Sequence, residues 1–329
     1  MGSNRTTKDA TNRREFLGAA AGAVAATQLP FEIDTTAKAA ENRGNGENKK
    51  AILKPASTDP CALVPLTDTI RCSRIGFGTG MRGGNRESNV TRMGREKANR
   101  MLRFAYDHGV RLFDCADLYG THAFVAEALE GKPRDSYTLV SKLWVLPGGI
   151  PEPLEDRPDV VASVERFLKE LKTDHIDLVQ LHCMTAADWP TKWARQMDAL
   201  AKLKEQGKIR AHGVSTHSNK AVVAAAESNW ADAVHVRLNS EGERMDGKPS
   251  PETVANTVDA VRKAHDAGLG VVAMKVVGEG VFRDKPELRK KSTDFETNLD
   301  CVNVMIVGFD ETEHITEFIG NVAAALKTA

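Results

Sequence analysis

Four side chains with complementary acid–base chemistry lie at or just after the ends of three consecutive apolar runs. Asp114 ends the first run and Tyr119 follows it, Lys142 ends the second run, and His182 ends the third. An unperturbed tyrosine has a pKa near ~10, which is too high for efficient proton donation near neutral pH. A neighbouring ammonium group favours the phenolate and lowers that pKa. We therefore expect Lys142 to lower the pKa of Tyr119, with Asp114 as the carboxylate partner of Lys142.

A set of this kind can pass a proton to a substrate oxygen that gains negative charge. His182 can hydrogen-bond the oxygen of a carbonyl substrate. None of the four side chains supplies a hydride or a carbanion, so the reducing equivalent must come from a cofactor. Each of these residue types, taken alone at a strand end, is more often structural than catalytic. Their combination on three neighbouring runs is what predicts an active site.

The elements that must position these side chains repeat along the chain. Eight apolar runs alternate with helical patterns from about residue 74 onward, which predicts eight βα units. The runs lie at 75–79, 111–114, 137–142, 176–182, 211–215, 234–238, 270–275 and 302–307. Several are apolar without alternation, as in parallel strands that are buried on both faces. Apolar stripes at helical spacing predict helices over 159–172, 191–206 and 251–267.

The repeat predicts an α/β fold with a single (β/α)8 barrel, the TIM barrel, over residues 61–329. This length suits such a barrel, which takes roughly 250 residues. The rival is a doubly wound sheet, but no G-x-G-x-x-G follows the first predicted strand with an acidic residue about twenty positions on. Because reactive groups lie at the carboxyl ends of barrel strands, we expect the four side chains at one mouth.

From about residue 65 to 318 the sequence resembles the aldo-keto reductases, which are NAD(P)H-dependent (β/α)8 barrels. The matching segments are Gly-Phe-Gly-Thr-Gly at 76–80, Phe-Asp-Cys-Ala-Asp-Leu-Tyr-Gly at 113–120, Ser-Lys at 141–142, Asp-His-Ile-Asp-Leu-Val-Gln-Leu-His at 174–182 and Gly-Val-Ser at 213–215. The resemblance implies reduction of an aldehyde, ketone or sugar to an alcohol, or the reverse reaction. The implied catalytic tetrad is Asp114, Tyr119, Lys142 and His182. Tyr119 would be the general acid, and His182 would orient the carbonyl.

The same resemblance implies a nicotinamide cofactor, NADP or NAD, along the barrel mouth. The implied cofactor-binding residues are Gly78, Thr79, Ser215, His235, Lys275, Gly278, Gly280, Gly308 and Asp310. Ser215 would contact the nicotinamide carboxamide, and His235 stands where the family commonly has glutamine. The glycines of the 278–280 loop would approach the pyrophosphate by their backbone.

The segment after the last predicted strand bears on the choice between NADP and NAD. It carries three acidic side chains, at 310, 311 and 313, and no arginine. A carboxylate repels the 2′-phosphate of NADP but accepts hydrogen bonds from ribose hydroxyls. The same carboxylates are also common at the solvated start of a helix. The sequence therefore leaves the cofactor preference open.

Three tryptophans bear on the substrate side of the site. Trp144, Trp189 and Trp193 lie in or just after the loops that follow the runs at 137–142 and 176–182. Loops at these positions usually cover a barrel mouth, so they suggest a pocket lined by aromatic side chains. Trp193 also fits the apolar stripe of the helix predicted over 191–206, which favours a place in the core.

The composition excludes several classes of protein. The chain has 329 residues with 45 Lys+Arg and 45 Asp+Glu, so it lacks the basic excess of a nucleic-acid-binding protein. Its five cysteines include no C-x-x-C pair, which argues against a zinc ribbon, and no histidine spacing indicates a metal site. Cys61 and Cys72 flank a predicted hairpin and could pair, whereas Cys115 and Cys183 are expected to be buried structural thiols.

The first sixty residues differ from the rest of the chain. Arg13 and Arg14 precede a run rich in alanine and glycine, an order typical of a twin-arginine (Tat) export signal. We expect a Tat signal peptide over 1–39, with the cleavage site open, and a disordered linker over 40–60. The run is poor in leucine and would be a weak membrane anchor. The sequence therefore predicts a periplasmic protein that uses the Tat machinery and has no stable membrane span when mature.

Two other functions are compatible with the same residues. A barrel with altered residues at 235 and 310 could bind a nicotinamide nucleotide with little or no turnover. A non-redox isomerase or lyase could use Tyr119 and Lys142 as acid and base. Cofactor binding without turnover would indicate the first, and a lack of any nicotinamide binding would indicate the second.

Overall fold

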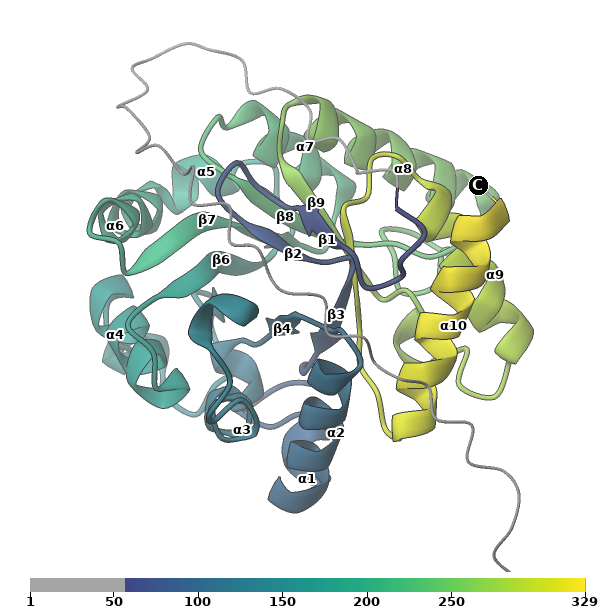
Figure 1. The fold of residues 1–329 in the computed structure, drawn as a ribbon. Helices are drawn as coiled ribbons and strands as arrows, with labels where there is room; N and C mark the ends of the chain where they lie inside the picture. The colour runs from purple at the N-terminus through teal and green to yellow at the C-terminus, as the bar shows by residue number, and fades with distance from the viewer. Residues whose placement is uncertain (1–56, 329) are drawn as a thin grey trace, which may run out of the picture. The chain divides into compact units, whose positions relative to one another are not determined.

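All eight predicted apolar runs form strands, and parallel pairing closes these strands into a barrel (Figure 1). The structure is a computed structural model and describes residues 57–328. The barrel strands are β3 (Ile75–Gly78), β4 (Leu112–Asp114), β5 (Thr138–Leu143), β6 (Ile176–Met184), β7 (Ile209–Thr216), β8 (Ala233–Arg237), β9 (Gly270–Met274) and β10 (Val304–Val307). Each strand pairs with the next, and β10 pairs with β3 to close the ring. The predicted (β/α)8 barrel is therefore confirmed.

Helices surround the barrel on its outer side (Figure 1). The longer helices are α2 (Arg95–Asp107), α3 (His122–Ala128), α4 (Val160–Leu171), α6 (Ala194–Glu205), α7 (Asn219–Glu227), α8 (Pro251–Asp266), α9 (Pro286–Asn298) and α10 (Thr312–Thr328); the short ones are α1 (Asn89–Arg92) and α5 (Trp189–Lys192). The predicted helices over 159–172 and 251–267 are confirmed to within a residue at each end. The predicted helix over 191–206 instead divides at Trp193 into α5 and α6.

Helix α4 shows how local sequence sets these elements. Asp159 caps its amino end by accepting a hydrogen bond from the Ala162 N–H at 2.8 Å. At the other end Lys172 takes a left-handed conformation, with φ of 53°, and stops the helix. Between the two caps Phe167 and Leu168 face inward and belong to the main apolar core. The apolar stripe thus fixes which side of α4 is buried.

A two-stranded hairpin covers the amino ends of the barrel strands. Strands β1 (Leu63–Pro65) and β2 (Arg71–Ser73) pair antiparallel. Val64, Leu66 and Ile70 are fully buried and form one apolar cluster with residues of the barrel strands. The hairpin lies close enough to β9 that a Cβ added at Gly270 would stand 1.8 Å from the Leu66 carbonyl oxygen. This contact explains why β9 begins with glycine.

Two cysteines, Cys61 and Cys72, lie in or beside the hairpin, where they could form a disulfide. Cys72 is fully buried on β2, in register with Val64, while the Cys61 thiol donates a weak hydrogen bond to the His108 carbonyl oxygen at 3.4 Å. Both thiols are free. The Cys61–Cys72 pairing that the sequence left open therefore does not form in this structure.

Two sequence expectations concern residues beyond the described part of the chain. The signal peptide over 1–39 lies outside residues 57–328, as does all but the end of the linker over 40–60. Within 57–328, no helix has both the length and the apolar character needed to cross a membrane. The same residues include no group of three or more His, Cys, Asp and Glu side chains arranged to hold a metal ion.

Candidate active site

A buried ion pair forms the base of the site, at the carboxyl ends of β4 and β5. Asp114 is 2% exposed and Lys142 is 1% exposed. The Lys142 ammonium donates one hydrogen bond to Oδ1 of Asp114 and another, of 2.9 Å, to the carbonyl oxygen of Cys115. Burial alone would raise the pKa of Asp114, but the adjacent Lys142 charge contributes to holding that pKa below its usual value. Asp114 is therefore a carboxylate at neutral pH.

Tyr119 lies directly against this pair. It ends the one-turn 3₁₀ helix η1 (Asp117–Tyr119) that follows β4. Its hydroxyl is 3.2 Å from Nε2 of His182, and the two rings meet edge to face with centroids 5.3 Å apart. The Lys142 nitrogen lies 5.1 Å from the centroid of the tyrosine ring. The structure thus brings together all four residues of the predicted tetrad.

Two glycines hold the tyrosine ring in place. A Cβ added at Gly80 would stand 2.2 Å from Cζ of Tyr119, and one at Gly83 would stand 2.6 Å from Cδ1. The Gly83 N–H donates to the Gly80 carbonyl oxygen at 2.9 Å, which folds the loop into a turn. Only residues without a side chain allow this turn to approach the ring. At Gly84, in contrast, an added Cβ would meet no atom within 4 Å.

The net shift of the Tyr119 pKa in this structure is opposite in direction to the expected one. Burial raises the pKa of Tyr119 well above its usual value of 10.0, and the nearby Asp114 carboxylate adds to the increase. The Lys142 ammonium directs its hydrogen bonds to Asp114 and Cys115, and burial of the phenol determines the direction of the shift. Tyr119 is therefore a protonated phenol at neutral pH, which is the state that a proton donor requires.

His182 is a neutral imidazole. It is 2% exposed, and burial together with the Lys142 charge lowers its pKa well below 6.5. Its Nδ1 has no hydrogen-bond partner among residues 57–328, while Nε2 faces the Tyr119 oxygen. The edge of Trp144 packs against the imidazole with centroids 5.3 Å apart. With the proton on Nε2, His182 donates to the phenol oxygen and leaves the phenol hydrogen free for another acceptor.

Three further buried side chains near the mouth have polar atoms without hydrogen-bond partners in the described residues. They are Oε1 of Gln180, Oγ of Ser215 and both ring nitrogens of His235. Ser215 and His235 are register partners on β7 and β8, and each is at most 1% exposed. Nε2 of His235 approaches Oδ1 of Asp114 to 3.3 Å without the alignment of a hydrogen bond. Unsatisfied buried groups of this kind require a polar partner, such as a ligand.

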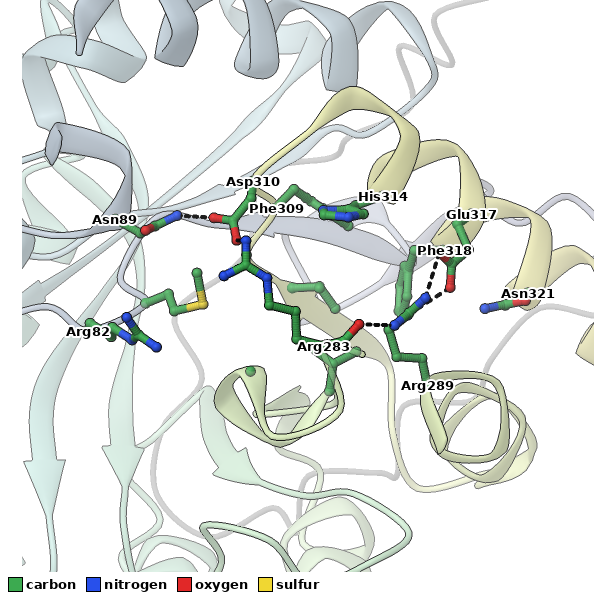
Figure 2. A pocket seen from close by; sticks show the side chains of 15 residues that line it. Arg82, Asn89, Arg283, Arg289, Phe309, Asp310, His314, Glu317, Phe318 and Asn321 are labelled. Carbon is green, nitrogen blue, oxygen red and sulfur yellow. Dashed lines mark hydrogen bonds and ion pairs between the residues drawn. The ribbon is translucent and has the colours of Figure 1, made fainter. Parts of the chain in front are cut away.

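Two adjoining hollows open beside the tetrad. The first, of about 540 Å³, is bordered by Tyr119 and Asp114 and by residues at the ends of β9 and β10. The second, of about 800 Å³, lies further along and is bordered by helix α10 (Figure 2). Both volumes include space that is open to solvent. The hollows share four lining residues, so they form one elongated groove; the shared residues are Met81, Val277, Val307 and Gly308.

The second hollow contains arginines that sequence reasoning missed. Arg82, Arg283 and Arg289 line it, although they lie on separate segments of the chain (Figure 2). Nη2 of Arg283 is 3.3 Å from Oδ2 of Asp310, so the acidic charge noted in the sequence has a basic partner. Arg289 makes a two-pronged ion pair with Glu317, at 2.8 and 3.0 Å. No spacing in the sequence signals these arginines, because only the closed barrel brings their segments together.

Most of the remaining predicted cofactor residues border the groove. Gly78 and Lys275 border the first hollow, and Gly280 and Asp310 border the second. Gly308 borders both. These five residues therefore lie where a ligand in the groove would touch them.

Of the nine predicted cofactor residues, Ser215 and His235 border neither hollow, and the same is true of Thr79 and Gly278. The Thr79 hydroxyl is used inside the fold, where it donates to the Asp114 carbonyl oxygen at 2.8 Å. Gly278 is buried against the ring of Phe282, at the start of the 3₁₀ helix η4 (Gly278–Gly280). The structure thus gives Thr79 and Gly278 a role within the fold.

The two cysteines that follow tetrad residues differ from each other. Cys115 is fully buried, as expected for a structural thiol, and burial raises its pKa to about 12. Cys183 is only half-buried, so that expectation is wrong for it. A register shift in β6 accompanies a φ of 63° at Cys183, whose Sγ lies 3.5 Å from Nε2 of His217. The sequence does not reveal this bulge, because residue types and spacing do not determine the backbone geometry at Cys183.

The three tryptophans that suggested an aromatic pocket separate in the structure. Trp144 packs on His182 at the site. Trp189 is 1% exposed and donates a hydrogen bond to the Ala221 carbonyl oxygen at 3.1 Å, so it belongs to the core. Trp193 packs against the same core from the junction of α5 and α6, as its helical spacing indicated. Of the three, Trp144 is the one that contacts the tetrad.

A comparison with known protein families identifies the family to which this chain is related. The family model described as "Aldo/keto reductase family" matches residues 74–328. The chain belongs to the aldo/keto reductase family. This match covers all eight barrel strands, and it confirms the resemblance drawn from the 76–80, 113–120, 141–142, 174–182 and 213–215 segments.

Individual relatives are similar over part of their length. The aldo-keto reductase YhdN of Bacillus subtilis is 34% identical over 166 residues, which are 46% of this chain and 46% of that protein. The methylglyoxal reductase DkgB of Salmonella typhimurium is 29% identical over 136 residues, 40% of this chain and 48% of that protein. The chain thus matches about half the length of these two curated relatives.

Solved structures share the fold. An aldo-keto reductase from Bacillus halodurans, in its holo form, superposes with a TM-score of 0.61 at 20% identity and covers 80% of this chain and 95% of that one. An aldo/keto reductase from Klebsiella pneumoniae, in complex with NADP and acetate, superposes with a TM-score of 0.59 at 21% identity, over 79% and 89% of the two chains. At these identities the likeness concerns the barrel architecture.

Proposed function

We propose that the chain is an NADPH-dependent oxidoreductase that reduces a small aldehyde, ketone or sugar to an alcohol, or runs the reverse reaction. The observation that carries the proposal is the contact between the Tyr119 hydroxyl and Nε2 of His182 at 3.2 Å, beside the buried Lys142–Asp114 pair. It joins a protonated phenol, a neutral imidazole and a fixed positive charge at one barrel mouth. This set suits proton donation to a carbonyl oxygen.

The residues around the mouth fit a nicotinamide. A carboxamide offers one carbonyl acceptor and one NH₂ donor, and the site offers unsatisfied partners for both. Oγ of Ser215 and a ring N–H of His235 can donate to the carbonyl, and Oε1 of Gln180 can accept from the NH₂. The elongated groove that leads away from Tyr119 suits the rest of a dinucleotide. These features support the prediction that Ser215 and His235 hold the cofactor.

The far hollow favours NADP(H) over NAD(H). Three arginines line it, against the two carboxylates of Asp310 and Glu317. Because Arg283 pairs with Asp310, that carboxylate can orient a guanidinium toward a phosphate instead of repelling it. The NADP complex of the Klebsiella pneumoniae relative adds support. We therefore assign the 2′-phosphate to Arg82 and Arg283.

The proposed mechanism uses each tetrad residue once. Bound NADPH would supply the hydride that reduces the carbonyl carbon. As the substrate oxygen gains negative charge, Tyr119 transfers its phenol proton to that oxygen, and the product is an alcohol. Lys142, 5.1 Å from the ring centroid, stabilises the negative charge left on the phenolate, and Asp114 holds Lys142 in place. The Nε2–H group of His182 donates a hydrogen bond to the reacting oxygens and so orients the carbonyl group.

Absorbance at 340 nm tests the proposal with the purified chain. Oxidation of NADPH in the presence of short aldehydes, ketones or aldoses is the expected result, and fluorescence titration should give a lower Kd for NADPH than for NADH. Nucleotide binding with no turnover across the panel would indicate a binding barrel instead. A chain that binds neither nucleotide would indicate a non-redox enzyme.

We also propose that residues 1–39 direct export through the Tat pathway to the periplasm. The support is the order of Arg13, Arg14 and the apolar run in the sequence. The Tat route carries folded proteins, so we expect the nucleotide to be bound before export and released with the protein on denaturation. Cell fractionation should recover wild-type protein from the periplasm, while the Arg13→Lys, Arg14→Lys double variant remains in the cytoplasm. Equal distribution of the two proteins would contradict the proposal.

A further inference from the structure

The loop that follows β5 begins with the tryptophan that packs on the tetrad. Trp144 comes directly after β5, and its ring meets the imidazole of His182 edge to face, with centroids 5.3 Å apart. Nε2 of that imidazole faces the Tyr119 hydroxyl, but Nδ1 has no hydrogen-bond partner among residues 57–328. Since no hydrogen bond from this part of the chain fixes the Nδ1 side, packing against Trp144 helps to orient the imidazole.

The indole of Trp144 is in turn held by the loop that it begins. Its Nε1–H donates a hydrogen bond to the carbonyl oxygen of Gly148 at 2.6 Å. A Cβ added at Gly149 would stand 2.6 Å from Cε2 of Trp144, so the loop backbone lies directly on the indole. The next residue, Ile150, is buried and clusters with Leu118 of η1. The position of the indole therefore depends on the conformation of this loop.

Arg157 ties the loop together. It is half-buried, and its guanidinium donates to three backbone carbonyl oxygens: Nε to Glu152 at 3.0 Å, Nη2 to Gly148 at 2.8 Å, and Nη1 to Leu146. The Gly148 oxygen thus accepts hydrogen bonds from both Arg157 and Trp144. A hollow of about 680 Å³, which includes space open to solvent, is bordered by these two side chains. On that side the loop is supported by hydrogen bonds more than by packing.

We propose that Arg157 is a positioning residue for the active site, which holds Trp144 against His182 by hydrogen-bonding the loop between them. This inference adds a residue to the proposed reductase and so rests on the proposed function. The planar guanidinium directs several N–H groups along fixed directions, whereas a lysine ammonium is a single point from which three separated carbonyl oxygens cannot all be reached. The effect of Arg157 on catalysis passes through Trp144 and His182.

A spectroscopic test follows Trp144 directly. The chain has four tryptophans, and after labelling with 5-fluorotryptophan the ¹⁹F resonance that Trp144→Phe removes belongs to Trp144. We expect Arg157→Gln to shift or broaden this resonance and to leave those of the other tryptophans in place, with a smaller change in Arg157→Lys. An unchanged Trp144 resonance, or equal changes in all the resonances, would overturn the inference.

A double-mutant cycle tests the path to the reaction, with butanal as the aldehyde. Because a displacement of about 1 Å at a reacting group can cost about 10²-fold in rate, a partial loss of order in the loop should lower kcat/KM roughly 3- to 30-fold in Arg157→Gln. In a Trp144→Ala background the same substitution should cost less than about twofold, since the residue through which it acts is gone. An equal loss in the two backgrounds would overturn the inference.

The matched control is Arg111→Gln. Arg111 is also half-buried and donates to two backbone carbonyl oxygens, those of Tyr106 and Val110, but it precedes β4 at the opposite end of the barrel. We expect this variant to leave the Trp144 resonance in place and to change kcat/KM by less than about twofold. A loss as large as that of Arg157→Gln would indicate general loosening of the fold and would overturn the inference.

The ¹⁹F measurement needs no turnover, so it separates this inference from the proposed function. A Trp144 resonance that responds to Arg157→Gln supports the positioning role, even if the wild type oxidises no NADPH and the reductase proposal fails. Reduction of butanal by a chain whose Trp144 resonance does not respond leaves the reductase proposal intact and overturns the role of Arg157. If thermal unfolding shows that Arg157→Gln does not fold, Arg157→Lys carries the same comparison.

Discussion

The two sides of the barrel mouth differ in how far their polar groups are satisfied. On the β4–β5 side, Asp114 and Lys142 are paired with each other, and Tyr119 is packed between that pair and the glycines of the preceding loop. On the β6–β8 side, Ser215 and His235 carry buried polar atoms without hydrogen-bond partners in residues 57–328.

This difference indicates a division of work. The β4–β5 side is complete without any ligand, so its geometry is fixed before substrate arrives, as preorganised proton donation requires. The β6–β8 side is incomplete, and the cost of its unsatisfied groups is recovered only when a polar ligand binds. Variants on the first side should therefore change turnover or stability, and variants on the second side should change binding.

The largest effect on turnover is expected for Tyr119→Phe. The change removes the proton donor and keeps the ring packed on its glycines. Because general acid catalysis contributes about 10²- to 10⁴-fold, kcat should fall by that range, while the Kd for NADPH measured by fluorescence should stay within about twofold. A phenylalanine variant with a near-wild-type kcat would contradict the assignment of Tyr119.

Asp114→Asn tests whether the β4–β5 side is stabilised by its own pairing. The variant leaves the Lys142 charge buried without its carboxylate, and breaking a buried pair costs about 3–5 kcal/mol. Urea unfolding should detect a loss of that size in the free energy of unfolding. The exposed Arg262–Asp300 pair is the control, since Asp300→Asn should cost less than about 1 kcal/mol. Similar losses in both variants would mean that the buried pair does not fix this side.

Gly80→Ala tests the packing of the tyrosine. The added Cβ would stand 2.2 Å from Cζ of Tyr119, so the ring or the loop must move. A displacement of about 1 Å at a reacting group can cost about 10²-fold in rate, and kcat should fall toward that value. Gly84→Ala is the matched control, because its Cβ would meet no atom within 4 Å, and it should keep the wild-type kcat. Equal rates in the two variants would exclude a positioning role for Gly80.

Ser215→Ala addresses the incomplete side. Removing a buried hydroxyl that has no partner among the described residues should leave the free energy of unfolding unchanged or slightly higher. Loss of one hydrogen bond, about 0.5–1.5 kcal/mol, should weaken NADPH binding roughly 2- to 10-fold. The comparison would be wrong if Ser215→Ala destabilised the chain and left the Kd unchanged.

The smallest effect is expected from pH. The pKa of Tyr119 is raised above 10.0 and that of His182 is lowered below 6.5, so both groups keep one protonation state between these values. The kcat for reduction, measured at saturating NADPH, should therefore vary little from about pH 6.5 to about 9.5. A titration of kcat with a midpoint near ~8 that disappears in Tyr119→Phe would show that Lys142 does acidify the phenol.

Much of the fold and the tetrad could be predicted from the sequence. Uninterrupted apolar runs identify buried parallel strands, and parallel strands bring their carboxyl ends to one mouth, which was enough to place Asp114, Lys142 and His182 together. The direction of the Tyr119 pKa shift could not be predicted. It depends on how deeply the phenol is buried and on how near the Asp114 carboxylate lies, and residue types and spacing do not determine either.

Contacts between segments that are distant in the sequence could not be predicted either. Arg283 follows η4 and Asp310 follows β10, so their ion pair depends on barrel closure and loop path. Without Arg283, the acidic segment at 310–313 therefore predicted a stronger repulsion of the 2′-phosphate of NADP than the structure indicates. Likewise, the bulge at Cys183 follows from local backbone geometry that an apolar run does not reveal.

The β1–β2 hairpin determines the end of the barrel from which a ligand can approach. Val64, Leu66 and Ile70 close one end of the barrel with apolar side chains, and the hollow bordered by Asp114 and Tyr119 lies at the opposite end. A nucleotide and a substrate that bind beside the tetrad would therefore approach from the same end of the barrel. A nucleotide in the hollow that Asp114 borders would shield the Lys142–Asp114 pair from bulk solvent for as long as it stayed bound.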